Sequence, residues 1–170
     1  MNDKSNSFKE QLLDVVKAYF DEKGLETIYE EINGQPAVTV ILDDVVEFAP
    51  EDMSVTFTEL GDYLYMGLII PVEMEIEAQR LDDIEKLMPL LNNYLDTGGF
   101  YCHKDSGDLF FEQFWPAIEE DSMENTMTVL LTTVNDALTA VQDGREMLSR
   151  LLSGETTADE LIETEEYITQ

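Results

Sequence analysis

Cys102 and His103 form the only adjoining pair of side chains that could serve as a nucleophile and a base. On a strand the two would point to opposite faces, and the thiol could not pass its proton to the imidazole without distortion of the backbone. A reactive thiolate also needs positive charge nearby, which a chain with only nine lysines and arginines rarely supplies. We therefore predict a buried, unreactive thiol, an imidazole exposed at the rim, and no catalytic residues.

Clusters of carboxylates are the second feature with possible chemistry, at Asp43-Asp44, Glu51-Asp52, Asp82-Asp83 and Glu119 to Asp121. None has the alternating oxygen ligands and central glycine of a calcium loop. No phosphate loop, nucleophile elbow or zinc-ligand spacing occurs either. The sequence predicts no cofactor and no dedicated metal site, although weak, nonspecific calcium association stays open. A glycosidase that uses only carboxylates is the least favoured class of function.

The charge of the chain is unusual, because 38 acidic residues against 9 basic ones give a formal net charge of −29 over 170 residues. Such a surface repels nucleic acid and anionic membranes and favours basic partners or divalent cations. The simpler interpretation is that the acid keeps the protein soluble or reflects a host with an acidic proteome. A hydrophobic fraction of 44% is ordinary for a globular protein, so the chain should fold.

The stretch from Tyr63 to Glu77 indicates the fold class. Its even positions are all apolar, which places them on one face of an extended strand: Leu64, Met66, Leu68, Ile70, Val72, Met74 and Ile76. The odd positions change from half-apolar to acidic, and Pro71 marks an edge or the end of pairing. We expect an ordered strand over Tyr63 to Val72, paired antiparallel with the alternating segment Met53 to Thr58 through a short turn.

The N-terminal third predicts a helix followed by a hairpin. Ser7 and Glu10 have the spacing of a capping box, and Gly24 suits the end of the helix. Asn33-Gly34 is a strong hairpin signal before the strand Pro36 to Leu42. The preceding segment, Glu26 to Glu31, is a weaker strand that could instead be a helical turn. A short edge segment is expected at Val45 to Phe48.

The C-terminal half predicts a helix over Leu81 to Tyr94, kinked or restarted at Pro89, then a hairpin and a long helix. The hairpin joins Phe100 to Lys104 with Asp108 to Trp115. The long helix runs from about Ser122 to Leu152. Thr157 and Glu160 form a second capping box that opens a short, acidic helix.

Together these elements predict an α+β fold, with an antiparallel sheet of about five strands packed on one face by the N-terminal and the long C-terminal helices. Residues 1–154 should form a single domain, and residues 155–170 a C-terminal helical tail that is at most loosely docked. Its deletion should cost less than about 1 kcal/mol.

The location of the protein follows from what the sequence lacks. A single cysteine rules out an internal disulfide, and the N-terminus has no apolar core of signal-peptide length. The longest apolar run, Tyr63 to Val72, is about half of a membrane span. We expect a cytoplasmic protein without a membrane partner.

Apolar residues on both faces of the predicted sheet suggest a binding surface. Leu109, Phe111 and Trp115 would share one face, whereas Phe110 and Phe114 would lie on the other. Tyr65 and Ile69 lie opposite the even positions of the central strand. We expect the partner-binding residues to be Tyr65, Ile69, Phe110 and Phe114, at an interface with another protein or in a homodimer. Alternatively, residues 43–52 or the C-terminal helix fold over these four.

The segment from Pro89 to Gln113 carries a family resemblance. It combines a helix that ends in the pair Leu91-Asn92, the aromatic-led strand Gly99-Phe100-Tyr101, an acidic turn and the return strand Asp108 to Phe111. In this motif, and in its element order from Phe8 to Leu152, the chain resembles the YbjN-like family of bacterial proteins. That family shares its architecture with the type III secretion chaperones. The Asn33-Gly34 hairpin, Pro89 and the acidic tail depart from the family pattern.

The resemblance implies a small, non-enzymatic protein with a chaperone-like fold, in a family described as candidate regulators of sensory transduction. The motif contains no catalytic residue to transfer. Our leading hypothesis is a cytoplasmic protein-binding module, chaperone-like or regulatory. The alternative is an acidic mimic of nucleic acid that captures a basic DNA-binding protein, which would bind in a steeply salt-dependent way.

Overall fold

The computed structural model describes residues 3–42, 48–61, 63–93, 95, 97–117 and 123–168, with side chains between residues 8 and 164 of these ranges except at Met123. Its helices are α1 (Asp3–Glu22), α2 (Leu81–Asn93), α3 (Met123–Leu152) and α4 (Ala158–Ile168), with a 3-10 turn, η1 (Ala78–Arg80), before α2. Its strands are β1 (Thr27–Ile32), β2 (Gln35–Ile41), β3 (Asp52–Leu60), β4 (Tyr63–Glu73), β5 (Gly99–His103) and β6 (Asp108–Pro116).

The strands form one antiparallel sheet in the order β1-β2-β3-β4-β6-β5, which confirms the predicted α+β class. The sheet has six strands and not about five, because the weak segment before the first hairpin is a strand. Asn33 and Gly34 link β1 to β2 with φ angles of 52° and 77°. A two-residue turn with both φ angles positive matches the twist of the strands, which explains why Asn-Gly predicts it well.

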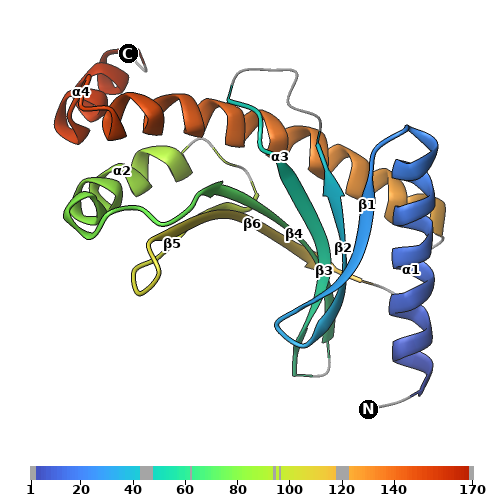
Figure 1. The fold of residues 1–170 in the computed structure, drawn as a ribbon. Coiled ribbons are helices and arrows are strands. Elements are labelled where there is room, and N and C mark those ends of the chain that lie inside the picture. Colours follow the sequence, from blue (N-terminus) through green and yellow to red (C-terminus); the bar gives the residue numbers. More distant parts are fainter. Residues whose placement is uncertain are drawn as a thin grey trace.

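Helices α1 and α3 pack against the sheet as predicted, α1 beside β1 and β2 and α3 across β4 (Figure 1). Along β4, Met66, Leu68 and Ile70 are fully buried in the core that these helices share. The pairing of β4 with β6 becomes irregular between Pro71 and Glu73, where the missing proline amide was expected to interrupt it.

Two close contacts fix the helices on the sheet. The buried Lys9 of α1 donates from Nζ to Glu59 Oε1 at 2.6 Å and to Gln35 Oε1 at 2.8 Å, which ties α1 to β2 and β3. On α3, a Cβ at Gly144 would lie 2.7 Å from the Phe100 ring. The glycine in the middle of the long helix therefore lets α3 approach β5.

Three expectations differ from the structure or fall outside it. The first helix begins at Asp3, so the capping box at Ser7 is wrong; residues 3–6 contain no glycine or proline that would stop the helix. Pro89 lies inside one continuous helix, α2, and starts no second one. Of the expected edge segment, Val45 to Glu47 lie outside the described residues, and Phe48 belongs to a turn.

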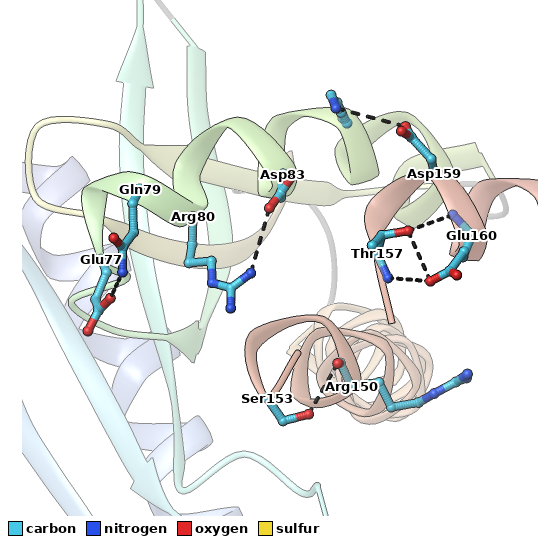
Figure 2. Close-up of polar contacts among 10 residues, drawn as sticks. Glu77, Gln79, Arg80, Asp83, Arg150, Ser153, Thr157, Asp159 and Glu160 are labelled. Atoms are coloured by element: carbon cyan, nitrogen blue, oxygen red, sulfur yellow. Dashed lines mark hydrogen bonds and ion pairs between the residues drawn. The ribbon is translucent and has the colours of Figure 1, made fainter. Parts of the chain in front are cut away.

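The C-terminal helix is docked more firmly than expected. Its capping box is formed: Thr157 N donates to Glu160 Oε2 at 2.9 Å, and Glu160 N donates to Thr157 Oγ1 at 3.2 Å (Figure 2). Ala158 and Leu161 are buried, and α4 packs against α2. The expectation of loose docking is therefore wrong for the first half of α4. The acidic residues of this half are exposed, and the buried side chains of Ala158 and Leu161 are enough to dock the helix.

Candidate protein-binding face

The four predicted partner-binding residues lie on one face of the β4–β6 ladder. The register pairs Gly67 with Phe114, Ile69 with Glu112 and Pro71 with Phe110. Residues directly opposite each other point to the same face, so Tyr65, Ile69, Phe110 and Phe114 share it. Ile69 is the diagonal neighbour of both phenylalanines, and the four side chains form a continuous band.

This face of β4, β6 and β5 has no helix over it in the described part of the chain (Figure 1). Phe114 is 41% exposed, and Tyr65, Ile69 and Phe110 are half-buried. The alternative that the C-terminal helix covers them is not met, since α4 packs against α2. Residues 43–47 of the other proposed cover lie outside the described residues. We call the band of these four residues, with Tyr101, the open face.

Tyr101 belongs to the open face but is absent from the predicted set. It pairs with Phe110 across the β5–β6 ladder and is 52% exposed. Its neighbour Phe100 is buried and makes an edge-to-face contact with Phe111, with ring centroids 5.4 Å apart. The alternation of Phe100 and Tyr101 along β5 was the signal that could have placed Tyr101 on this face.

Gly67 shapes the middle of the open face. A Cβ built on Gly67 would lie 2.3 Å and 2.5 Å from two ring carbons of Phe114, so the ring lies directly over the glycine. An aromatic ring over a strand glycine fills the gap that the missing side chain leaves. The glycine thereby leaves room for the Phe114 ring to rest on the strand, and 41% of Phe114 remains exposed.

Polar groups lie within the open face and at its border. Glu112 lies between the two phenylalanines of β6, and its Oε1 is 4.0 Å from His103 Nε2. The His103 ring meets Phe110 edge-to-face at 5.4 Å. On the neighbouring strands β3 and β2, this face carries small side chains, and the hydroxyls of Thr39 and Ser54 lie 2.7 Å apart. The apolar band therefore occupies β4, β6 and β5 only.

A cavity of about 420 Å³ adjoins the band at Pro71. It is lined by Glu51, Asp52, Pro71, Val72, Glu73, Met74 and Arg145. Burial, and secondarily the nearby Glu51 carboxylate, raise the pKa of Asp52. The Arg145 guanidinium donates to the carbonyl of Ala49 at the same end of the sheet. The lining of the cavity is therefore acidic: it contains three carboxylates and one arginine, and that arginine is hydrogen-bonded to a backbone carbonyl.

Cys102 and His103 do not form a catalytic pair. Cys102 is half-buried and pairs with the core residue Leu109, whereas His103 is mostly exposed beside Phe110 on the opposite face. Burial, followed by the charge of Glu85, raises the pKa of the thiol, which disfavours the thiolate. Among the described residues, no three side chains of His, Cys, Asp or Glu are grouped as metal ligands would be.

Asn92, a residue of the sequence motif, has a structural role. Its Nδ2 donates to the Phe100 carbonyl at 3.1 Å, and its Oδ1 accepts from the Phe100 amide at 2.7 Å. The side chain thus joins the end of α2 to β5. None of the helices that the structure describes is long and apolar enough to span a lipid bilayer.

Comparison with known proteins finds a similar fold among solved structures and no similar sequence. No family model matches the sequence, and no curated protein matches it. Among solved structures, the fold is similar to the crystal structure of YbjN, a "putative transcription regulator" from E. coli. The TM-score is 0.50 at 11% sequence identity, over 80% of this chain and 93% of YbjN. The fold of this chain is therefore YbjN-like.

Proposed function

We propose that this protein is a non-enzymatic, chaperone-like or regulatory binding module of the cytoplasm that holds a segment of another protein on its open face. One observation carries the proposal: aromatic side chains remain in solvent on a sheet face that no described helix covers. Exposed apolar area of this kind usually marks an interaction site. Tyr, Phe and other large side chains are also the residues that anchor protein interfaces.

Charge favours a foreign partner over a second copy. Two copies would bring together chains of formal charge −29 each, with Glu112 in the centre of both faces. Like charges brought into contact oppose association. A segment whose apolar side chains are flanked by lysine or arginine satisfies both the band and its acidic border. We therefore assign the open face to such a segment.

The test compares a double variant of the open face with a variant on the other side of the molecule. Tyr65→Ser with Phe114→Ser removes two side chains from the open face. Val129→Ser removes an apolar side chain of α3, which packs on the opposite face of the sheet, and this side chain is 48% exposed. Each protein is used to capture partners from its host, and the captured protein is then purified and its dissociation constant measured for all three forms.

We expect both variants to fold, and only the open-face variant to weaken binding by at least about tenfold, as loss of a central aromatic anchor does. Equal binding by all three forms would contradict the proposal. Repeating the titration at two salt concentrations separates the functions, since an apolar contact tolerates salt. A steep loss of affinity with salt, unchanged by the open-face substitutions, would instead support the mimic of nucleic acid.

A further inference from the structure

We infer that the exposed edge of the sheet at β1 binds an extended, basic and apolar segment of another protein as an added strand. The inference goes beyond the proposed function, because it adds a second binding site at the edge of the sheet opposite to β5. It rests on the proposed function for the claim that the partner is a protein, and it states the residue pattern that the added strand must have. Strand addition supplies affinity through backbone hydrogen bonds and specificity through alternate side chains.

The hydrogen-bond pattern of β1 identifies its free backbone groups. Ile41 N donates to Glu26 O at 2.9 Å, so Glu26 directs its polar groups toward β2. In an antiparallel ladder this direction alternates along the strand. Thr27, Tyr29 and Glu31 consequently direct their amides and carbonyls away from the sheet. Their register partners on β2 are Val40, Val38 and Pro36, and the last has no amide to donate.

This outer edge is accessible. Residues 28–31 are all exposed, including Ile28 at 45% and Tyr29 at 48%. Helix α1 reaches β1 through side chains only, with Lys17 Nζ donating to Thr27 Oγ1 at 2.6 Å and Tyr29 Oη donating to Asp14. No described backbone group pairs with β1 from outside the sheet. Natural sheets protect such an edge with charges, a bulge or a covering group, and of these β1 has only the charges of Glu30 and Glu31, which a basic segment would neutralise.

The opposite edge of the sheet, at β5, is covered by a side chain. The Asn92 side chain donates to the carbonyl and accepts from the amide of Phe100, as a neighbouring strand would. In a strand of five residues, this leaves little outward backbone for another chain. The two edges thus differ: β5 is closed by a side-chain amide, whereas β1 is open.

The charge of β1 identifies its occupant. Glu26, Glu30 and Glu31 make the edge acidic, so β1 of a second copy would be repelled, and β5 of a second copy is closed. A foreign strand needs basic residues opposite Glu30 and Glu31 and apolar residues opposite Ile28 and Tyr29. Two basic residues followed by two apolar ones, read antiparallel to β1, satisfy this pattern.

The test uses a synthetic probe, the fluorescent peptide acetyl-Thr-Lys-Arg-Val-Val-Thr-amide, titrated against the full chain. One control peptide carries N-methyl groups on the Lys, the first Val and the last Thr, whose amides would face β1. A matched control carries three N-methyl groups on the first Thr, the Arg and the second Val, whose amides would face away from β1. We expect the first control to bind at least about tenfold more weakly than the second, because only the first loses strand hydrogen bonds. Equal affinities would overturn the inference.

A protein variant gives the reciprocal result. Glu31→Pro removes one outward amide at an edge position where proline is tolerated, and Glu31→Gln removes the charge but keeps the amide. We expect a loss of about tenfold for Glu31→Pro and of less than about threefold for Glu31→Gln at physiological salt. On peptide binding, hydrogen exchange should slow at the amides of Tyr29 and Glu31. Unchanged exchange at both amides would contradict strand addition.

Failure here is distinguishable from failure of the proposed function. The open-face variant, Tyr65→Ser with Phe114→Ser, should bind the peptide as the unsubstituted chain does. If the peptide does not bind and this variant still loses the cellular partner, strand addition is wrong and the open face stands. If the peptide binds at β1 and the variant keeps its partner, the open-face proposal alone is wrong.

Discussion

The two faces of the β4–β6 ladder are built from the same strands and differ in what they contact. On one face Met66, Leu68 and Phe111 are buried beneath the helices. On the other, Ile69 follows Leu68 and is half-buried, and Phe114, three residues after Phe111, is 41% exposed. That a residue is apolar therefore does not show whether it stabilises the fold or binds a partner. A side chain stabilises the fold where a helix covers it and is available to a partner where none does.

The largest expected difference between the faces is in stability. Phe111→Ala should lower the free energy of unfolding by about 3–5 kcal/mol, because it leaves a cavity in the core. Phe110→Ala, its immediate neighbour on the open face, should lower it by about 1 kcal/mol or less. Denaturant unfolding of the two variants measures both values. Similar losses would mean that the open face is packed in solution.

A second prediction asks how far the covered side extends. Leu161→Ala should cost about 2–3 kcal/mol if α4 is part of the core, because the buried leucine packs against α2. Glu163→Ala, on the exposed side of the same helix, is the matched control and should change stability by no more than about 0.5 kcal/mol. Thermal unfolding of both variants distinguishes a docked helix from the dispensable tail that composition suggested.

Local structure could be predicted from the sequence better than long-range contacts between elements. The alternation in β4 and the Asn33-Gly34 turn are local patterns with few competing solutions, and both are present. The docking of α4 rests on Ala158 and Leu161 meeting α2, about seventy residues away in the chain, which six nearby acids gave no reason to expect. The burial of Lys9 could not be predicted either, because its ion-pair partner Glu59 lies fifty residues away and comes close only in the folded sheet.

The same reasoning applies to the candidate site. Alternation along the strand is enough to predict that Phe110 and Phe114 lie opposite Phe111, and the register confirms it. The sequence also predicted that the first and the long helix pack on one face of the sheet. It left open whether residues 43–52 or the C-terminal helix cover the other face, because a helical stripe does not state which surface it covers. Asn92 belongs to a recognisable motif, yet its role at the β5 edge depends on the position of α2.

A smaller effect is expected at Gly67, where the open face is held in shape. Gly67→Ala should cost about 1 kcal/mol and weaken partner binding, because the new methyl group displaces the Phe114 ring. In a Phe114→Ala background the same substitution should be neutral or stabilising, since glycine weakens a strand interior. A double-mutant cycle on unfolding midpoints and on dissociation constants measures the coupling. Additive effects would show that the ring does not rest on the glycine.

The smallest expected effect is the pH dependence of the α4 cap. Hydrogen bonds from the Thr157 amide, then from the hydroxyls of Thr157 and Thr156, lower the pKa of Glu160 below its ordinary 4.5. Because the pKa of Glu160 is lower in the folded than in the unfolded state, its ionised carboxylate stabilises the folded protein at pH values above the unfolded-state pKa. This stabilisation is lost as the pH falls through the folded-state pKa. The difference in unfolding midpoint between the unsubstituted chain and Glu160→Gln should therefore shrink in acid. A constant difference down to about pH 2 would refute the role of the carboxylate.

Site-specific photocrosslinking tests the central claim most directly, because it asks which face touches another protein. A benzophenone amino acid replaces Phe114 in one variant, Phe110 in a second and the exposed α3 residue Val129 in a third, and host cells that produce each variant are irradiated. The open-face account predicts one adduct of the same size from positions 114 and 110, and none from position 129. Adducts from all three positions alike, or from position 129 alone, would contradict it.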